Sequence, residues 1–146
     1  MKVPSFWIRW LYVVVLGVML FGASMFIAPT AIRQFLSALI YSSPDQIEAA
    51  YSADANDYIM LVHGVLGTTL FGWGVAMFLI LRGPFSQGRS GGWSLIAWPI
   101  LLWYLSDTAY SLYTGFWQNA VLNTVLAVLF AVPLVATRKC FRVETN

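Results

Sequence analysis

Four apolar stretches, each long enough to form a membrane-spanning helix, most strongly constrain what this chain can fold into. They lie at about residues 7–28, 58–81, 93–113 and 117–136. An α-helix needs about 20 consecutive apolar residues to cross the hydrocarbon core of a bilayer. The pattern predicts an all-α integral membrane four-helix bundle, a single four-span domain over residues 1–146, with residues 29–57 connecting the first two spans.

Composition supports a membrane class and excludes several others. Only 10% of the 146 residues are charged, whereas about 25% is usual in soluble proteins, so the chain cannot cover itself with a polar surface. This excludes a soluble globular domain and a nucleic-acid-binding module. The single Cys and single His exclude a disulfide framework and a multi-histidine metal site within one chain, and we expect no metal.

Basic residues are distributed unevenly between the connections. With four spans, seven of the eight bases fall on the side that holds both termini: Lys2, Arg9, Arg82, Arg89, Arg138, Lys139 and Arg142. Arg33 falls on the other side, within residues 29–57, together with four acidic residues. Because short cytoplasmic segments carry the excess of Lys and Arg in membrane proteins, this bias predicts both termini in the cytoplasm and residues 29–57 outside.

The connection at residues 29–57 carries two helix signals. Apolar residues recur at helical spacing in its first part: Ile32, Phe35, Leu36, Leu39 and Ile40. This pattern predicts a short amphipathic helix lying in the membrane interface. Ser43, Pro44 and Gln46 then match a capped helix start, which predicts a second short helix through about Ser52. The pair is either a structured connection or a lid over an outward-facing cavity.

Two ionisable side chains, His63 and Asp107, fall inside the predicted spans. At about 1.5 Å per helical residue they lie roughly 7 and 9 Å from the outer surface. Ser111, Asn119 and Asn123 fall at a similar depth, whereas the remainder of the spans, serines and threonines apart, is apolar. We therefore expect these five side chains to face a common interior in the outer third of the bilayer.

Three roles are open for this polar cluster. Its members could hydrogen-bond the helices together, as polar side chains commonly do in membrane bundles. They could bind a ligand, with aromatic side chains forming the wall of the site: Trp103, Tyr104, Tyr110 and Trp117. Alternatively, Asp107 and His63 could act as general acid and base on a lipid, sterol or isoprenoid, in a double-bond isomerisation or a cyclisation. The two asparagines would then orient a hydroxyl group.

His63 also allows axial ligation of a haem or a chlorophyll. Haem iron commonly takes a second ligand such as Met, but Met60 lies one turn away on the same helix and cannot reach the opposite face of the macrocycle. We therefore expect no cofactor.

Small residues recur every four positions along the second span, at Gly64, Thr68, Gly72 and Ala76, with Gly67 and Gly74 nearby. Such spacing lets another helix backbone approach closely. The neighbouring helix is either another span of the same chain or belongs to a second copy or a partner subunit.

The segments 107–111, 115–119 and 123–124, with sequences DTAYS, GFWQN and NT, resemble small four-helix bacterial membrane proteins, which implies a bacterial inner-membrane location. The four-span plan is also similar in outline to the fold shared by sterol isomerases and the sigma-2 receptor. The acidic pair of that family has no counterpart here, since Asp107 is the only acid within the predicted spans, so none of its functional residues is carried over.

Two classes of function follow from these observations. The first is a non-enzymatic membrane protein, either an accessory subunit of a larger complex or a lipid-binding protein. The alternative is a lipid-, sterol- or isoprenoid-modifying enzyme of the isomerase or cyclase type that uses Asp107 and His63.

Overall fold

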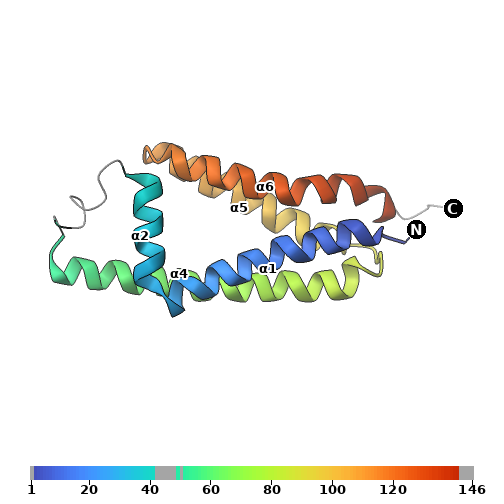
Figure 1. Cartoon of the computed structure of the whole chain (residues 1–146). Helices are drawn as coiled ribbons and strands as arrows, with labels where there is room; N and C mark the ends of the chain where they lie inside the picture. The colour runs from blue at the N-terminus through green and yellow to red at the C-terminus, as the bar shows by residue number, and fades with distance from the viewer. Residues whose placement is uncertain (1, 42–48, 50, 142–146) are drawn as a thin grey trace. The chain divides into compact units, whose positions relative to one another are not determined.

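The computed structural model describes residues 2–41, 49 and 51–141, and their regular structure is entirely helical. The helices are α1 (Ser5–Ile27), α2 (Pro29–Ile40), α4 (Ala53–Ile80), α5 (Ser94–Tyr113) and α6 (Trp117–Thr137), with the short helices η1 (Leu81–Phe85) and η2 (Arg138–Phe141). Figure 1 shows this order from blue to red. The all-α prediction is confirmed, and each predicted apolar stretch is helical over nearly its whole length.

Three helices of the described chain are long and apolar enough to cross a membrane: Ser5–Ile27, Ala53–Phe85 and Trp117–Phe141. The third predicted span is present as α5 but is not one of these three. Polar residues interrupt its apolar run and lower its hydropathy: Ser94, Ser106, Asp107, Thr108 and Ser111.

The chain divides into two compact units, each described here by itself. Unit 1 comprises Met1–Leu16 and Val75–Asn146, and unit 2 comprises Gly17–Gly74. The long helices α1 and α4 contribute residues to both units. That residues 1–146 form a single domain stays a prediction.

In unit 2, α1 and α4 approach each other closely at three glycines. A Cβ on Gly22 would lie 2.6 Å from the backbone nitrogen of Phe71, and one on Gly67 would lie 2.5 Å from Cβ of Met25. A Cβ on Gly74 would lie 2.5 Å from Cγ of Met19. Gly67 and Gly74 are seven residues apart and therefore share one face of α4, so this face makes the contact with α1.

The predicted stripe of small residues on α4 lies mainly outside this contact. Gly67 packs against α1, but Gly64 and Gly72 have open space where a Cβ would stand. Thr68 and Ala76 are exposed. The four positions of the repeat are therefore absent from the α1–α4 contact, whereas the nearby Gly67 and Gly74 make it. Whether a second copy or a partner subunit covers the repeat stays a prediction.

The predicted short helix is present as α2, and its place in the membrane interface stays a prediction. It follows α1 after Ala28, whose backbone is non-helical (φ −131°, ψ 58°), and it has Pro29 in its first turn. Figure 1 shows α2 running at a steep angle to α1. Arg33 Nη2 donates a hydrogen bond to Asn56 Oδ1 at 2.8 Å, which joins α2 to α4. The second predicted short helix falls mostly on residues outside the described ones.

The helix α4 begins at Ala53, earlier than the predicted start of the second span near residue 58. The reason is a local cap. Ser52 Oγ accepts a hydrogen bond from the backbone N–H of Ala55 at 3.2 Å, which satisfies one of the free amides of the first turn. Asp54 lies in that turn, where a negative charge interacts favourably with the helix dipole.

In unit 1, α5 and α6 form the tight antiparallel hairpin that the sequence predicts. Gly115 (φ 84°) supplies the left-handed conformation after α5. Phe116 N–H donates to Ser111 O at 2.8 Å and Gly115 N–H donates to Leu112 O at 3.2 Å. These are the two hydrogen bonds of a Schellman motif, and they end α5 so that α6 can start at Trp117.

The core of unit 1 lies where α1, η1, α5 and α6 contribute apolar side chains. Its most buried members are Leu11, Val15, Leu81, Phe85, Ile96 and Phe130. The Phe85 ring also contacts the Phe141 ring of η2, with a centroid distance of 4.9 Å.

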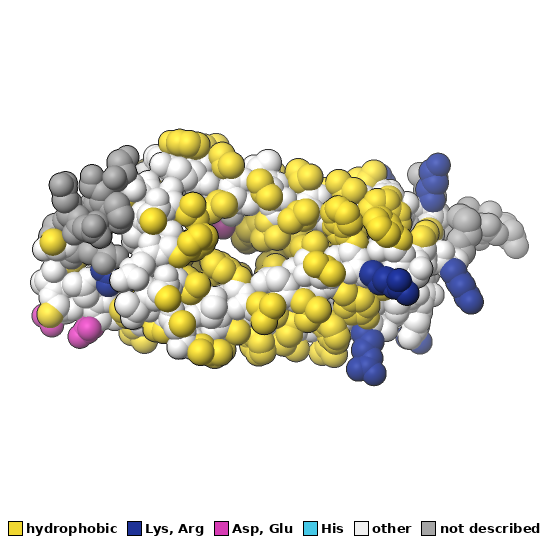
Figure 2. Space-filling model, in the orientation of Figure 1, with side chains coloured by type: hydrophobic (Ala, Val, Ile, Leu, Met, Phe, Trp, Pro, Cys, Tyr) yellow, Lys and Arg dark blue, Asp and Glu magenta, His cyan; other side chains and the backbone are white. Residues whose placement is uncertain are grey.

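The described bases of unit 1 are all exposed: Lys2, Arg9, Arg82, Arg89, Arg138 and Lys139. Figure 2 shows Lys and Arg side chains gathered at the end of this unit where Figure 1 marks the two termini. One end of unit 1 is therefore strongly basic.

A tryptophan of α1 compensates for a proline of α6. Pro133 has no N–H, so the carbonyl of Leu129, four residues earlier, loses its helical hydrogen-bond donor. Trp10 Nε1 donates to this same carbonyl at 2.9 Å. The indole therefore fills a backbone position that the proline leaves open, which fixes α1 against α6.

Candidate functional site

Three of the predicted site residues meet at the α5–α6 hairpin. Asn119 Nδ2 donates to Ser111 Oγ at 2.8 Å and to Asp107 Oδ1 at 3.2 Å. Ser111 Oγ lies 2.7 Å from the Asp107 carbonyl, to which it donates. Asp107 and Asn119 are half-buried and Ser111 is buried. This network, the hairpin cluster, joins the two helices through side chains alone.

Two buried polar atoms near the hairpin cluster have no hydrogen-bond partner among the described residues. They are Thr108 Oγ1 and Asn123 Nδ2. Thr108 follows Asp107 on α5, and Asn123 lies one turn beyond Asn119 on α6. An unpaired buried donor costs free energy, so an oxygen acceptor that reaches the Asn123 amide, such as a water or a ligand hydroxyl, would be bound favourably.

His63 belongs to unit 2, whereas the hairpin cluster belongs to unit 1, so its pairing with Asp107 stays a prediction. The imidazole is half-buried on α4, and its Nδ1 lies 2.9 Å from the Ile59 carbonyl oxygen. A carbonyl oxygen can only accept, so Nδ1 carries the proton. In the neutral ring Nε2 is then the atom with a lone pair.

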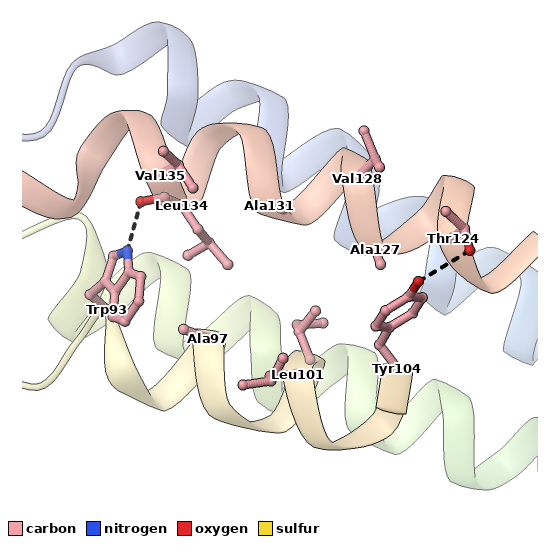
Figure 3. A pocket seen from close by; sticks show the side chains of 11 residues that line it. Trp93, Ala97, Leu101, Tyr104, Thr124, Ala127, Val128, Ala131, Leu134 and Val135 are labelled. Carbon is pink, nitrogen blue, oxygen red and sulfur yellow. Dashed lines mark hydrogen bonds between the residues drawn. The ribbon is translucent and has the colours of Figure 1, made fainter. Parts of the chain in front are cut away.

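A long apolar groove lies between α5 and α6, with a cavity volume of about 400 Å³. Figure 3 shows its lining residues on the facing sides of the two helices. They are Trp93, Ala97, Ile100, Leu101 and Tyr104 from the α5 side, and Thr124, Ala127, Val128, Ala131, Leu134 and Val135 from α6. Ala97, Ala127 and Ala131 leave the space, because larger side chains there would fill it.

Each end of the groove is marked by a hydrogen bond between the two helices (Figure 3). At one end Trp93 Nε1 donates to the Leu134 carbonyl at 2.7 Å. At the other, Tyr104 Oη and Thr124 Oγ1 are 3.3 Å apart. The Thr124 hydroxyl donates its own proton to the Ala120 carbonyl at 2.8 Å, so Tyr104 is the donor. Between these ends the groove offers apolar contact only.

The groove opens toward the surroundings of the protein along its length. Leu101, Val128 and Val135 line it and are 43%, 51% and 73% exposed.

The predicted aromatic wall is distributed over different surroundings. Tyr104 lines the groove, whereas Trp103 is half-buried and not among the lining residues. Tyr110 and Trp117 are 68% and 61% exposed. Of the four, Tyr104 lines the groove, and the aromatic wall around the polar cluster stays a prediction.

The groove was not predicted from the sequence, because the predicted site was built on polar residues. The available signal was the small pair Ala127 and Ala131, one helical turn apart on α6, which lets a gap form beside α5.

Comparison of this chain with protein-family models, with curated proteins and with solved structures finds no match. Within the described part of the chain, no group of three or more His, Cys, Asp or Glu side chains could hold a metal ion.

Proposed function

We propose that this chain is a membrane-embedded lipid-binding protein, with four spans and with both termini in the cytoplasm of a bacterial cell. Three helices with the length and composition of membrane spans support this, together with the α5–α6 hairpin. The basic end of unit 1, where the termini lie, agrees with the positive-inside rule (Figure 2). In this topology α5 is the third span.

The α5–α6 groove is the single observation that carries the lipid-binding role. Its volume of about 400 Å³ falls within the range of pockets that hold small molecules, and its lining suits a hydrocarbon chain. Its exposed flank would let a lipid enter sideways from the bilayer. The groove supports lipid binding in particular, and the accessory-subunit role stays a prediction.

Native mass spectrometry of the protein purified in mild detergent tests this proposal. We expect the wild-type chain to retain a lipid molecule, and Ala131→Phe to lose it because the added ring fills the groove. Ala136→Phe is the matched control, since Ala136 is also an exposed alanine of α6 but does not line the groove. Loss of lipid in both variants, or retention in Ala131→Phe, would contradict the assignment, as would a wild-type protein without lipid.

The second candidate function is a lipid-, sterol- or isoprenoid-modifying enzyme in which Asp107 acts with His63. The unpartnered Asn123 Nδ2, close in sequence to the hairpin cluster, favours it because this amide could hold a substrate hydroxyl. The variant Asp107→Asn distinguishes a catalytic role of Asp107 from a purely structural one. The amide oxygen still accepts from Asn119, so stability is kept, whereas turnover of an isoprenoid or sterol substrate would fall by about 10²-fold or more for a lost acid–base group.

A further inference from the structure

The length of the α5–α6 groove indicates how much of a lipid it can take. Its lining runs from Trp93 to Tyr104 on one helix and from Thr124 to Val135 on the other, which is about 16 Å at the rise of an α-helix. The hydrocarbon core of a bilayer is about 30 Å thick. The groove therefore spans about half of it, which is the depth that an acyl chain of one leaflet occupies.

Apolar contact alone gives such a groove little selectivity, because the surrounding lipid tails are as apolar as its walls. Selectivity must come from polar or charged groups at the ends. At the Tyr104 end the groove closes deep in the predicted span. At the Trp93 end it meets the basic end of unit 1, so a headgroup would lie there.

Arg138 lies at the Trp93 end of the groove, which we call the groove mouth. Its guanidinium carbon lies 5.6 Å from the centroid of the Trp93 ring, which lines the groove. A guanidinium that stacks on an aromatic face keeps the N–H groups at its rim free to donate, and these form paired hydrogen bonds with phosphate oxygens. Lys139, the next residue, is also exposed and basic.

We propose that the groove selects an anionic phospholipid of the cytoplasmic leaflet, with one acyl chain between α5 and α6 and the phosphate held by Arg138 above Trp93. The inference rests on the proposed lipid-binding function and adds the headgroup class and its leaflet. The charge at the Trp93 end of the groove supports this proposal, since Arg138 lies over a lining side chain and Lys139, the next residue, is exposed and basic.

The test reconstitutes the full chain in nanodiscs that contain equal amounts of phosphatidylglycerol and phosphatidylcholine. Native mass spectrometry then measures which lipid stays bound after the protein is released from the nanodisc. We expect the wild-type protein to retain phosphatidylglycerol preferentially. Arg138→Gln lowers this preference by about fivefold, which corresponds to about 1 kcal/mol for one charge at the membrane surface. Arg138→Lys keeps the charge and most of the preference.

Arg82→Gln is the matched control, because Arg82 is an exposed base of the same unit and its loss changes the net charge equally. We expect it to change the preference by less than twofold. Equal losses in Arg82→Gln and Arg138→Gln would overturn the assigned headgroup site in favour of a general surface charge, and lipid bound without headgroup preference would overturn the selectivity. Absence of any bound lipid in the wild type would instead contradict the proposed function itself.

Discussion

Two tryptophans hold α6 by donating to carbonyl groups that its own backbone leaves open. Pro133 frees the Leu129 carbonyl for Trp10. At the end of α6 the Arg138 N–H donates a hydrogen bond to Val135 O, three residues earlier. The Leu134 carbonyl, four residues earlier, instead accepts from Trp93 Nε1. In a hydrocarbon environment an unpaired carbonyl is costly, so both indoles stabilise the helix as well as its contacts.

Trp10→Phe tests this relationship at the scale of one hydrogen bond. The ring remains but the donor is lost, and we expect the free energy of unfolding in detergent to fall by about 1 kcal/mol. In a Pro133→Ala background the helix supplies its own donor to Leu129 O, so the cost of Trp10→Phe should drop to less than half. Thermal unfolding followed by circular dichroism measures both values.

Trp98→Phe serves as the control, because Trp98 is 57% exposed on α5, and we expect little effect in either background. If Trp10→Phe costs the same with Pro133 and with Ala at this position, the indole does not act through the Leu129 carbonyl.

The candidate site was predictable from sequence only where local spacing decides it. Asp107 and Ser111 are one turn apart on α5, and the short link at 114–116 brings Asn119 opposite them, so this cluster follows from the sequence. The groove does not, because it arises from the mismatch of side-chain volumes on two helices. The relation between His63 and Asp107 depends on how two units are arranged, which helical periodicity does not encode.

At the scale of elements, helix existence follows from hydropathy but helix contacts do not. The four predicted apolar stretches are helical, as α1, α4, α5 and α6, because long apolar runs in a membrane have few alternatives to a helix. The face of α4 that meets α1 was harder to predict, since small residues occur on more than one face. Gly67 and Gly74 make the contact, while Gly64 and Gly72 have open space beside them.

A glycine-to-alanine pair tests which face of α4 packs. Gly67→Ala places a Cβ 2.5 Å from Met25 Cβ and 2.7 Å from the Gly22 carbonyl oxygen, and such overpacking typically costs about 1–3 kcal/mol. Gly64→Ala meets open space, and alanine favours the helix, so stability should stay constant or rise. Unfolding of both variants under the same detergent conditions compares them, and equal stabilities would contradict the observed contact.

At the scale of the whole molecule, the proposed topology places the connection before α4 and the loop before α5 on opposite sides of the membrane. Introduced cysteines test it in a Cys140→Ser background. Ala53→Cys and Ser90→Cys both use exposed positions. We expect a membrane-impermeant maleimide to label the first in intact spheroplasts and the second only after lysis. The reverse pattern would invert the orientation, and labelling of both positions before lysis would contradict the single span, α4, that separates them in this topology.

The hairpin cluster has a consequence for biogenesis in the proposed four-span topology. Alone, α5 would carry the Asp107 carboxylate into the bilayer at a cost of a few kcal/mol on insertion scales. Asn119, on the far side of a three-residue link, supplies hydrogen bonds to that carboxylate and to Ser111. The two helices would therefore leave the translocon as a pair, with the strongly apolar α6 drawing its more polar neighbour into the lipid.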